Sequence, residues 1–434
     1  MFINSILGSI QKLLYPLYKS SFILKKLDWL IFVNIILVIV TSAFAQSDNI
    51  GYFALFAIIL TFIKLITKPN EKFSLSTADK FLLLYFVLVL VSVAGSTLLY
   101  ISFKGFCKTL IYFGFYISVV HYLKDNRDKL KYIILTISAV AFWEALVAIH
   151  QNFMSVSEIS GWQDMSRLNP EEVMTRVYGT LKPYNPNLFG GYLLAVLPTS
   201  LLAIFLPLKN HHYKTSLFGF ICFCLIVGAT VLTGCRGAYV GVFAELLLIT
   251  VFTFRMLKPY YKKLFGIFSA VISALVMFIV VTLPSLRARV FSIFAMRGDS
   301  SNSFRFNVYN SCIQMFKDNW LLGIGVGNQN FRETYGLYMR TGFDALSAYN
   351  IYLETAVESG IFALISFIGF LYVNLSKAVR FIFRRNSIKS VYLIIAVVSI
   401  MGMLVHGFVD TVFYRPQIQF IFWIMIGIIR VLLK

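Results

Sequence analysis

Acidic side chains, and charged side chains in general, are scarce in this sequence of 434 residues. Asp and Glu together number 19, all charged residues make up 13% of the chain, and hydrophobic residues make up 59%. A soluble domain carries about a quarter charged residues. So few polar groups do not cover a globular protein in water, which excludes a soluble or secreted protein. The mean hydropathy of +0.78 agrees with a chain whose solvent is lipid.

Patterns that hold metals or form disulfides are also missing. The five cysteines contain no CxxC pair, so neither a zinc site nor a disulfide framework is indicated. The five histidines never occur at HxxxH or HExxH spacing, and no metal or other cofactor is expected. The formal charge of +20 comes from Lys and Arg. In a membrane protein this excess serves topology and contact with anionic lipid, and we expect no nucleic-acid partner.

Long apolar runs are abundant instead. A transmembrane helix needs about 20 mostly apolar residues. By that measure the sequence predicts an all-α polytopic membrane protein with twelve spans, near 29–46, 50–67, 81–100, 105–122, 132–150, 188–207, 216–233, 237–254, 264–283, 351–373, 390–408 and 417–433. The first run ends in Ala43-Phe44-Ala45, which imitates a signal-peptidase site, but its length favours an uncleaved span. Residues 1–28 are basic and rich in Phe, Leu and Tyr, and predict an amphipathic segment on the inner membrane surface.

The distribution of Lys and Arg predicts the orientation. With both termini in the cytoplasm, most of the 39 basic residues fall in short inner connections, as the positive-inside rule requires. Two outer segments, 151–187 and 284–350, are too long to be simple connectors, and we expect function there. The chain therefore divides into the inner-surface segment, spans over 29–283, an outer loop over 284–350, and spans over 351–434.

An arginine stands between glycines where the seventh span ends and the eighth begins. Arg236 follows Gly234-Cys235 and precedes Gly237. Two interpretations are open. The side chain anchors the helix among lipid headgroups, or it binds a buried anion whose phosphate the glycine backbone allows to approach closely.

The end of segment 151–187 gathers side-chain donors at the predicted bilayer edge. They are Arg176, Lys182, Asn185 and Asn187. Proline and asparagine in this stretch also fix a turn. A purely structural role and the binding of a polar headgroup or sugar both remain open.

The outer loop 284–350 contains a helix signal and a glycine-rich turn. Asp299 and the serines after it are typical of a helix start, and the apolar spacing through Phe316 predicts an amphipathic helix with Arg305 in its first turn. The glycines of 320–328 resemble a phosphate loop. Because no Lys-Ser/Thr pair and no preceding strand accompany them, we exclude nucleotide binding and expect a tight backbone turn.

Polar residues also lie inside the last predicted spans. Three of them share one face of the tenth span, Asn350, Glu354 and Glu358. Carboxylates in a span usually face a cavity or a partner. His406 and Asp410 lie one turn apart near the outer end of the eleventh span, and Arg415 follows them. A local structural network and a role in a site are both open for these three residues.

These features, in this order, resemble the O-antigen ligase and O-antigen polymerase superfamily. The resemblance covers roughly residues 170 to 425. It rests on the Arg-Gly turn, the long outer loop with an early arginine, the Trp-Leu-Leu-Gly-Ile-Gly stretch and the Asn-x-Tyr-Leu-Glu start of the next span. Residues 176–181, 185–192 and 409–416 more narrowly resemble a branch often described as inorganic-carbon transporters.

The resemblance implies a GT-C-like membrane fold and an activity. Members of the ligase type transfer a glycan from an undecaprenyl-diphosphate carrier to an acceptor, which is a lipid, a saccharide or a protein. The transfer takes place at the outer face of the inner membrane, inverts the anomeric configuration and needs no metal. The resemblance assigns Arg236 and Arg305 to the diphosphate. Their position at the outer face, independent of the resemblance, adds Arg176, Asn187 and Arg415 as expected substrate-binding residues.

The resemblance also implies a general base, and here the sequence departs from the family. Ligases carry a histidine immediately before the Asn of the tenth-span motif, and this chain has Tyr349. A tyrosine with a pKa near 10 is a poor base unless neighbouring cations lower that pKa. Three alternatives are open: Tyr349 or Glu354 takes over the role of the histidine, the protein handles lipid-linked glycan by a different arrangement, or it is not a glycosyltransferase.

Transport is the main alternative function, and a non-catalytic membrane role is another. A bicarbonate or small-anion transporter needs a site near the membrane midplane, typically with broken helices, and does not need a long outer loop. Outer arginines beside aromatic residues suit a diphosphate at the interface with sugars above it. The sequence therefore favours glycan transfer.

Overall fold

The computed structural model describes residues 2–154 and 174–433, and every element in those ranges is a helix. Eleven described stretches are long and apolar enough to cross a membrane. They are α3 (Leu27–Phe44), α4 (Ser47–Thr67), α5 (Thr77–Ala94), α6 (Leu99–Asp125), α7 (Leu130–Gln151), the pair α8 (Pro186–Val196) and α9 (Ser200–Lys209), α10 (Tyr213–Leu232), α11 (Arg236–Met256), α12 (Pro259–Thr282), α16 (Ile351–Arg384) and α17 (Ile388–His406). The apolar helix α18 (Pro416–Leu432) is shorter. The predicted all-α polytopic membrane fold is confirmed.

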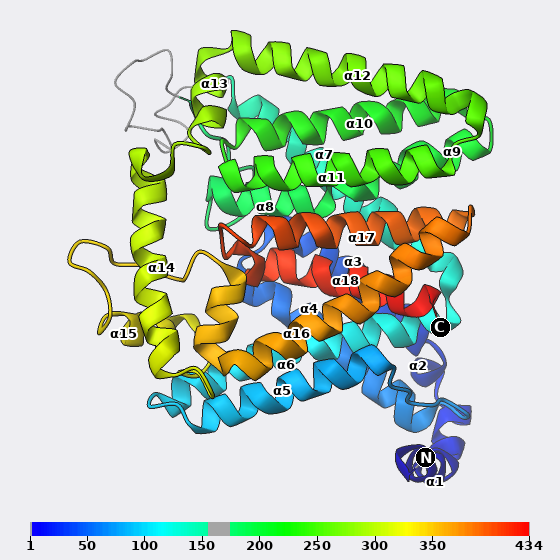
Figure 1. The fold of residues 1–434 in the computed structure, drawn as a ribbon. Helices are drawn as coiled ribbons and strands as arrows, with labels where there is room; N and C mark the ends of the chain where they lie inside the picture. The colour runs from blue at the N-terminus through cyan, green and yellow to red at the C-terminus, as the bar shows by residue number, and fades with distance from the viewer. Residues whose placement is uncertain (1, 155–173, 434) are drawn as a thin grey trace.

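The candidate spans lie side by side and give the bundle two distinct ends (Figure 1). One end, here called the loop end, carries α13 (Pro284–Phe291), α14 (Ser300–Asp318) and α15 (Asn328–Tyr335). Both chain termini lie at the opposite end, here called the termini end. Helix α14 runs across the loop end, roughly perpendicular to the spans, as a helix on a membrane surface does.

The centre of the bundle is formed by helices that are apolar on all sides. Nearly every residue of α8, α17 and α18 is buried. A helix that is hydrophobic all round requires such a central position. Helix α12, in contrast, stands at the edge of the bundle and contributes no buried residue. The core thus places the starts of α8 and α18 and the end of α17 beneath the loop end.

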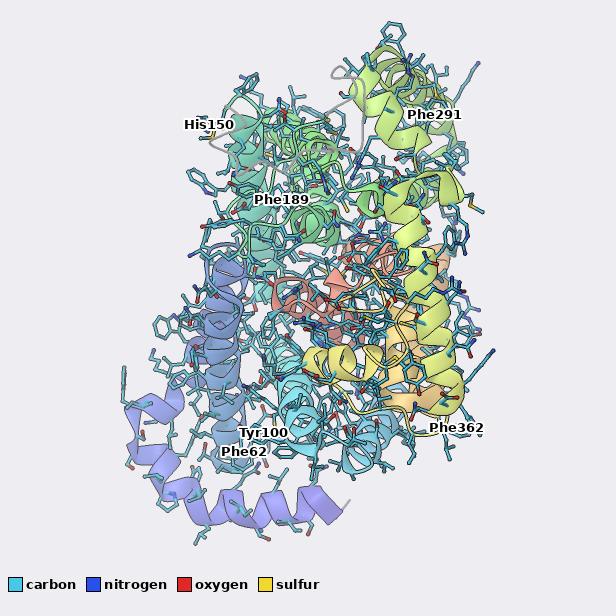
Figure 2. The ribbon with its side chains drawn as sticks, turned by 90° about the vertical axis from the view of Figure 1, so that its left-hand side faces the viewer. Phe62, Tyr100, His150, Phe189, Phe291 and Phe362 are labelled. Carbon is cyan, nitrogen blue, oxygen red and sulfur yellow. The ribbon has the colours of Figure 1, made fainter. Side chains whose placement is uncertain are left out.

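The termini end is held by buried ion pairs. The ammonium group of Lys64 is 1% exposed and lies 2.7 Å from Asp28 and 3.2 Å from both Glu71 and Asp125. Such a buried cation is tolerated because carboxylates surround it. Helix α1 (Phe2–Ser20) lies across this end (Figure 2). Its Gln11 donates hydrogen bonds to the carbonyls of Leu65 and Glu71.

Helix α16 is interrupted one-third of the way along, at Gly360. This residue has φ 77° and ψ 172°, which is not helical. The backbone groups released there bond to the segment before α15. Ile361 donates its N–H to the carbonyl of Trp320, and Ile324 donates to the carbonyl of Val357. The interruption therefore leaves its polar backbone paired with protein.

The glycine-rich segment 320–327 forms the tight turn that its sequence predicts. Gly323, Gly325 and Gly327 all have positive φ, a conformation that glycine adopts without steric cost. A Cβ at Gly323 would lie 2.4 Å from the backbone of Glu358. The Glu358 carboxylate accepts a hydrogen bond from the N–H of Gly327. The third residue of the polar face of α16 thus supports this turn.

Candidate active site at the loop end

Two arginines hold the turn that presents Arg236. Arg236 is the first residue of α11, and the turn before it contains Gly234 with φ 61°. The Arg176 Nε donates to the carbonyl of Thr233 at 2.8 Å, and the Arg289 Nε donates to the carbonyl of Gly234 at 2.7 Å. Cationic donors suit these carbonyls because charged hydrogen bonds are stronger than neutral ones. Segments 174–185 and 284–299 are thereby tied to the same turn.

Arg236 is buried and paired within the protein. Its side chain is 7% exposed, and its Nη1 lies 2.8 Å from the Oδ1 of Asp299 and 3.1 Å from the Oγ of Ser292. Asp299 caps α14 by accepting a hydrogen bond from the N–H of Asn302. Burial raises the pKa of the Asp299 carboxyl, but the bonds from Arg236 and Asn302 outweigh it and the pKa is lowered. Both side chains are therefore charged, and Arg236 forms an ion pair with Asp299 of the same chain.

Arg305 lies in the second turn of α14, not in the first turn as predicted, because the helix begins at Ser300. Its Nη2 is 3.6 Å from the Oδ2 of Asp410, and its guanidinium carbon is 5.7 Å from the centre of the Tyr349 ring. Its Nε is buried and meets no hydrogen-bond acceptor among the described residues. A buried N–H without an acceptor is costly. Arg305 consequently has a donor that a bound anion would satisfy.

These arginines form one group, here called the arginine cluster. It consists of Arg176, Arg236, Arg289 and Arg305. Arg289 and Arg305 lie close enough to Arg236 for their charges to repel it. Two carboxylates, Asp299 and Asp410, face the cluster. Guanidinium groups gathered this closely suit an anion that carries phosphate.

The two candidate bases occupy different positions. Tyr349 is half-buried beside Arg305, and burial together with the Asp410 charge raises its pKa although Arg305 acts in the opposite direction. Its phenol is therefore protonated at neutral pH. Glu354 is 6% exposed, and its Oε2 accepts a hydrogen bond of 2.9 Å from the N–H of Ala348. Tyr349 faces the arginine cluster, whereas Glu354 supports the backbone beneath it.

Asn187 joins the site, and Arg415 stands at its margin. The Oδ1 of Asn187 accepts a hydrogen bond from Arg176, while Asn185 caps α8 through the N–H groups of Asn187 and Leu188. The predicted turn is thus present, whereas the binding of a headgroup or sugar by this segment stays a prediction. Arg415 is exposed at the start of α18.

Asp410 pairs with Arg305 from another segment and not with its sequence neighbour Arg415. Its Oδ1 also accepts the N–H groups of Thr411 and Val412. His406 is buried, with its Nε2 3.7 Å from the Sγ of Cys235. The side chains predicted to form a local His–Asp–Arg network therefore face different partners.

Sequence reasoning missed the role of Arg289 in the site and the partner of Glu144. Arg289 was not singled out, because its contact with Gly234 joins residues 55 positions apart. Glu144 in α7 has a partner in Thr180, whose N–H and hydroxyl both donate to its carboxylate. The signal for this second pair was present as a buried carboxylate opposite a Gly-Thr turn.

A cavity of about 320 Å³ adjoins the Arg236–Asp299 pair. It is lined by Arg287, Ala288, Phe291, Ser292, Ala295, Gly298 and Asp299. Figure 2 looks onto the loop end and shows Phe291 on α13 at the margin of the molecule and Phe189 among the central helices. Among residues 2–154 and 174–433 there is no group of three or more His, Cys, Asp or Glu side chains arranged to hold a metal.

The comparisons with known proteins agree with this site. No curated protein matches the chain. Residues 220–368 match a family model described as O-Antigen ligase, and the matched part contains Arg236, Arg305, Tyr349 and Glu354. Arg176, Asn187 and Arg415 lie outside it. The matched segment is about a third of the chain, and it supports the resemblance to the O-antigen ligase superfamily and to membrane glycosyltransferases of the ligase or polymerase type.

Proposed function

We propose that this protein transfers a glycan from an undecaprenyl-diphosphate carrier to an acceptor hydroxyl at the loop end, on the extracytoplasmic face of the plasma membrane. The observation that carries the proposal is that Arg305 lies over the ring of Tyr349 with a buried Nε that meets no acceptor among the described residues. The family match supports the same class of reaction.

The positive charges of the arginine cluster indicate the donor substrate more clearly than they indicate the acceptor. A diphosphate esterified on both sides carries two negative charges, and such an anion suits a group of arginines. Arg236 and Arg305 are the residues that hold it, and the buried Nε of Arg305 donates to one of its oxygens. Arginine suits this role because its planar group binds two phosphate oxygens at once.

The reaction then follows from the positions of these groups. The acceptor oxygen attacks the anomeric carbon, and the bond between that carbon and the diphosphate oxygen breaks with inversion. The diphosphate leaves with the bonding electron pair, and its developing charge is stabilised by the arginines. In the small fraction of molecules in which Tyr349 is ionised, the acceptor proton passes to its phenolate beside Arg305, while Glu354 positions the backbone that carries Tyr349.

The interruption of α16 bears on the transport alternative. Broken helices in transporters present backbone groups to an ion. At the Gly360 interruption the N–H of Ile361 donates instead to the carbonyl of Trp320. The neighbouring carbonyl of Val357 accepts a hydrogen bond from the N–H of Ile324. This pairing supports glycan transfer over transport through α16.

The test is single-turnover transfer by the purified chain with an undecaprenyl-diphosphate-linked glycan. Arg236→Lys and Arg305→Lys each keep the charge and remove the bidentate geometry, so we expect the rate to fall by at least about a hundredfold. Arg332→Lys, an exposed site on α15, is the matched control and retains the wild-type rate. Normal product formation by both site variants would refute the proposal, and so would anion uptake into liposomes without glycan transfer.

A further inference from the structure

Each arginine that the proposed function assigns to the diphosphate already has a carboxylate partner. Arg236 pairs with Asp299 at 2.8 Å, and Arg305 lies 3.6 Å from Asp410. The Asp299 pair is the closer of the two. Asp410 also accepts two backbone N–H groups of its own turn, so it is the more firmly fixed carboxylate. A diphosphate oxygen that binds Nη1 of Arg236 therefore competes with Asp299 for that group.

We propose that Asp299 is an exchangeable counter-ion of Arg236. It neutralises Arg236 in the empty site, gives way when the diphosphate binds, and returns to Arg236 as the diphosphate product leaves. This inference rests on the proposed function and adds a residue that governs the release of product.

Burial makes a counter-ion necessary in the empty site. The side chains of Arg236 and Asp299 are 7% and 10% exposed. An unpaired charge at such depth costs several kcal/mol. Because Arg236 alternates between two anions in this scheme, its charge is compensated in both states.

The surroundings of Asp299 can accommodate its carboxylate when it leaves Arg236. It remains the N-cap of α14, where the N–H of Asn302 and the positive end of the helix stabilise a carboxylate. The cavity of about 320 Å³ that Asp299 lines provides space for the displaced side chain. Exchange therefore leaves neither charge without a partner.

The chemistry of the product explains why such a competitor is useful. Before transfer both ends of the diphosphate are esterified. Afterwards the terminal phosphate has lost its sugar and gained an ionisable oxygen, with a second phosphate pKa near about 6. The product is thus more negative than the donor and binds the arginine cluster more tightly. A carboxylate that competes for Arg236 counteracts this and speeds release.

The experiment measures binding of farnesyl diphosphate, a short prenyl diphosphate that represents the product, to the purified full chain. Asp299→Asn removes the charge and keeps an N-cap side chain. We expect it to lower the Kd roughly fivefold, as the loss of one competing ion pair implies. Glu333→Gln removes an exposed charge from α15 and leaves the Kd unchanged. Asp299→Ser, which is also neutral and can cap, repeats the test if the Asn variant does not fold.

Kinetics provide an independent readout. In Asp299→Asn we expect KM for the lipid-linked donor and the inhibition constant of the product to fall together, with kcat reduced as release slows. If Asp299 only positions Arg236, its removal raises the Kd and KM, which overturns the inference while leaving the proposed function intact. If Arg236→Lys also binds farnesyl diphosphate as wild type does, Arg236 does not hold the diphosphate, and both proposals fail.

Discussion

The carboxylate of Glu354 accepts a hydrogen bond of 2.9 Å from the N–H of Ala348. Ala348 immediately precedes Tyr349, which has φ 50° and lies at the arginine cluster. A carboxylate that fixes the backbone of its neighbour positions that neighbour's side chain. The sequence offered Tyr349 and Glu354 as alternative bases. In the structure Tyr349 lies at the arginine cluster, and Glu354 lies behind it and holds its backbone.

We expect Tyr349→Phe and Glu354→Gln to differ in their effects. Tyr349→Phe removes only the hydroxyl and should lower kcat by at least about a hundredfold, the lower end of a general-base contribution. Glu354→Gln retains an oxygen that accepts the Ala348 N–H, so we expect a loss below about tenfold. Tyr338→Phe, which loses only a bond to Asp318 on the same loop, serves as control. Near-normal turnover in Tyr349→Phe would show that another group activates the acceptor.

The pH dependence of transfer follows from the raised pKa of Tyr349. Burial and Asp410 hold this pKa above its usual value near 10, so the phenolate fraction grows with each step toward alkaline pH. We therefore expect kcat/KM to rise about tenfold per pH unit between about pH 7 and about pH 9. Tyr349→Phe should abolish the slope. A flat profile in the wild type would exclude the phenolate as base.

Gly360→Ala tests the interruption of α16. A Cβ at this position would lie 2.2 Å from the carbonyl oxygen of Leu321, and the residue has positive φ. We expect a loss of more than about 2 kcal/mol of stability, visible as a lower melting temperature in detergent. Gly266→Ala on α12 meets nothing within 4 Å and should leave the melting temperature unchanged or raise it. Equal melting temperatures for the two variants would contradict this account.

Orientation is tested by labelling single cysteines in intact cells, in a chain whose five native cysteines are replaced. Ser301 on α14 and Ser387 before α17 are both exposed and lie at the loop end and the termini end, respectively. Because basic residues concentrate at the termini end, Ser301→Cys should react with an impermeant maleimide from outside and Ser387→Cys should not. Labelling of Ser387→Cys alone would invert the orientation and remove the extracytoplasmic site.

The spans were predictable because hydropathy is a local property. A helix in lipid must be apolar along its whole length, so each span appears in the sequence as one continuous apolar run. The start of α14 was predictable for a similar reason, since Asp299 caps a helix through its near neighbour Asn302. The tight turn before α15 was readable from its glycines, which have few other uses at that spacing.

The pairings within the site were not predictable in the same way. Asp299 reads as an N-cap whether or not it also meets Arg236, 63 positions earlier in the chain. Asp410 has Arg415 close in sequence and pairs with Arg305. Gly360 lies in an apolar run that is indistinguishable from a continuous helix, because the segment that receives its backbone groups is 40 residues away. Only the tertiary structure determines which of these possible partners form a contact.

Helix α14 is attached in two chemically different ways along its length. Its N-terminal end is held to charged groups of other segments by the N-cap Asp299 and by Arg305 in the second turn. Its later turns bury Val308, Cys312 and Met315 against α15 and α16. Salt weakens the first kind of contact and strengthens the second. The N-terminal end of α14 is thus the part whose position responds to the ionic content of the surrounding medium, while the rest of the helix keeps its place as a fixed support.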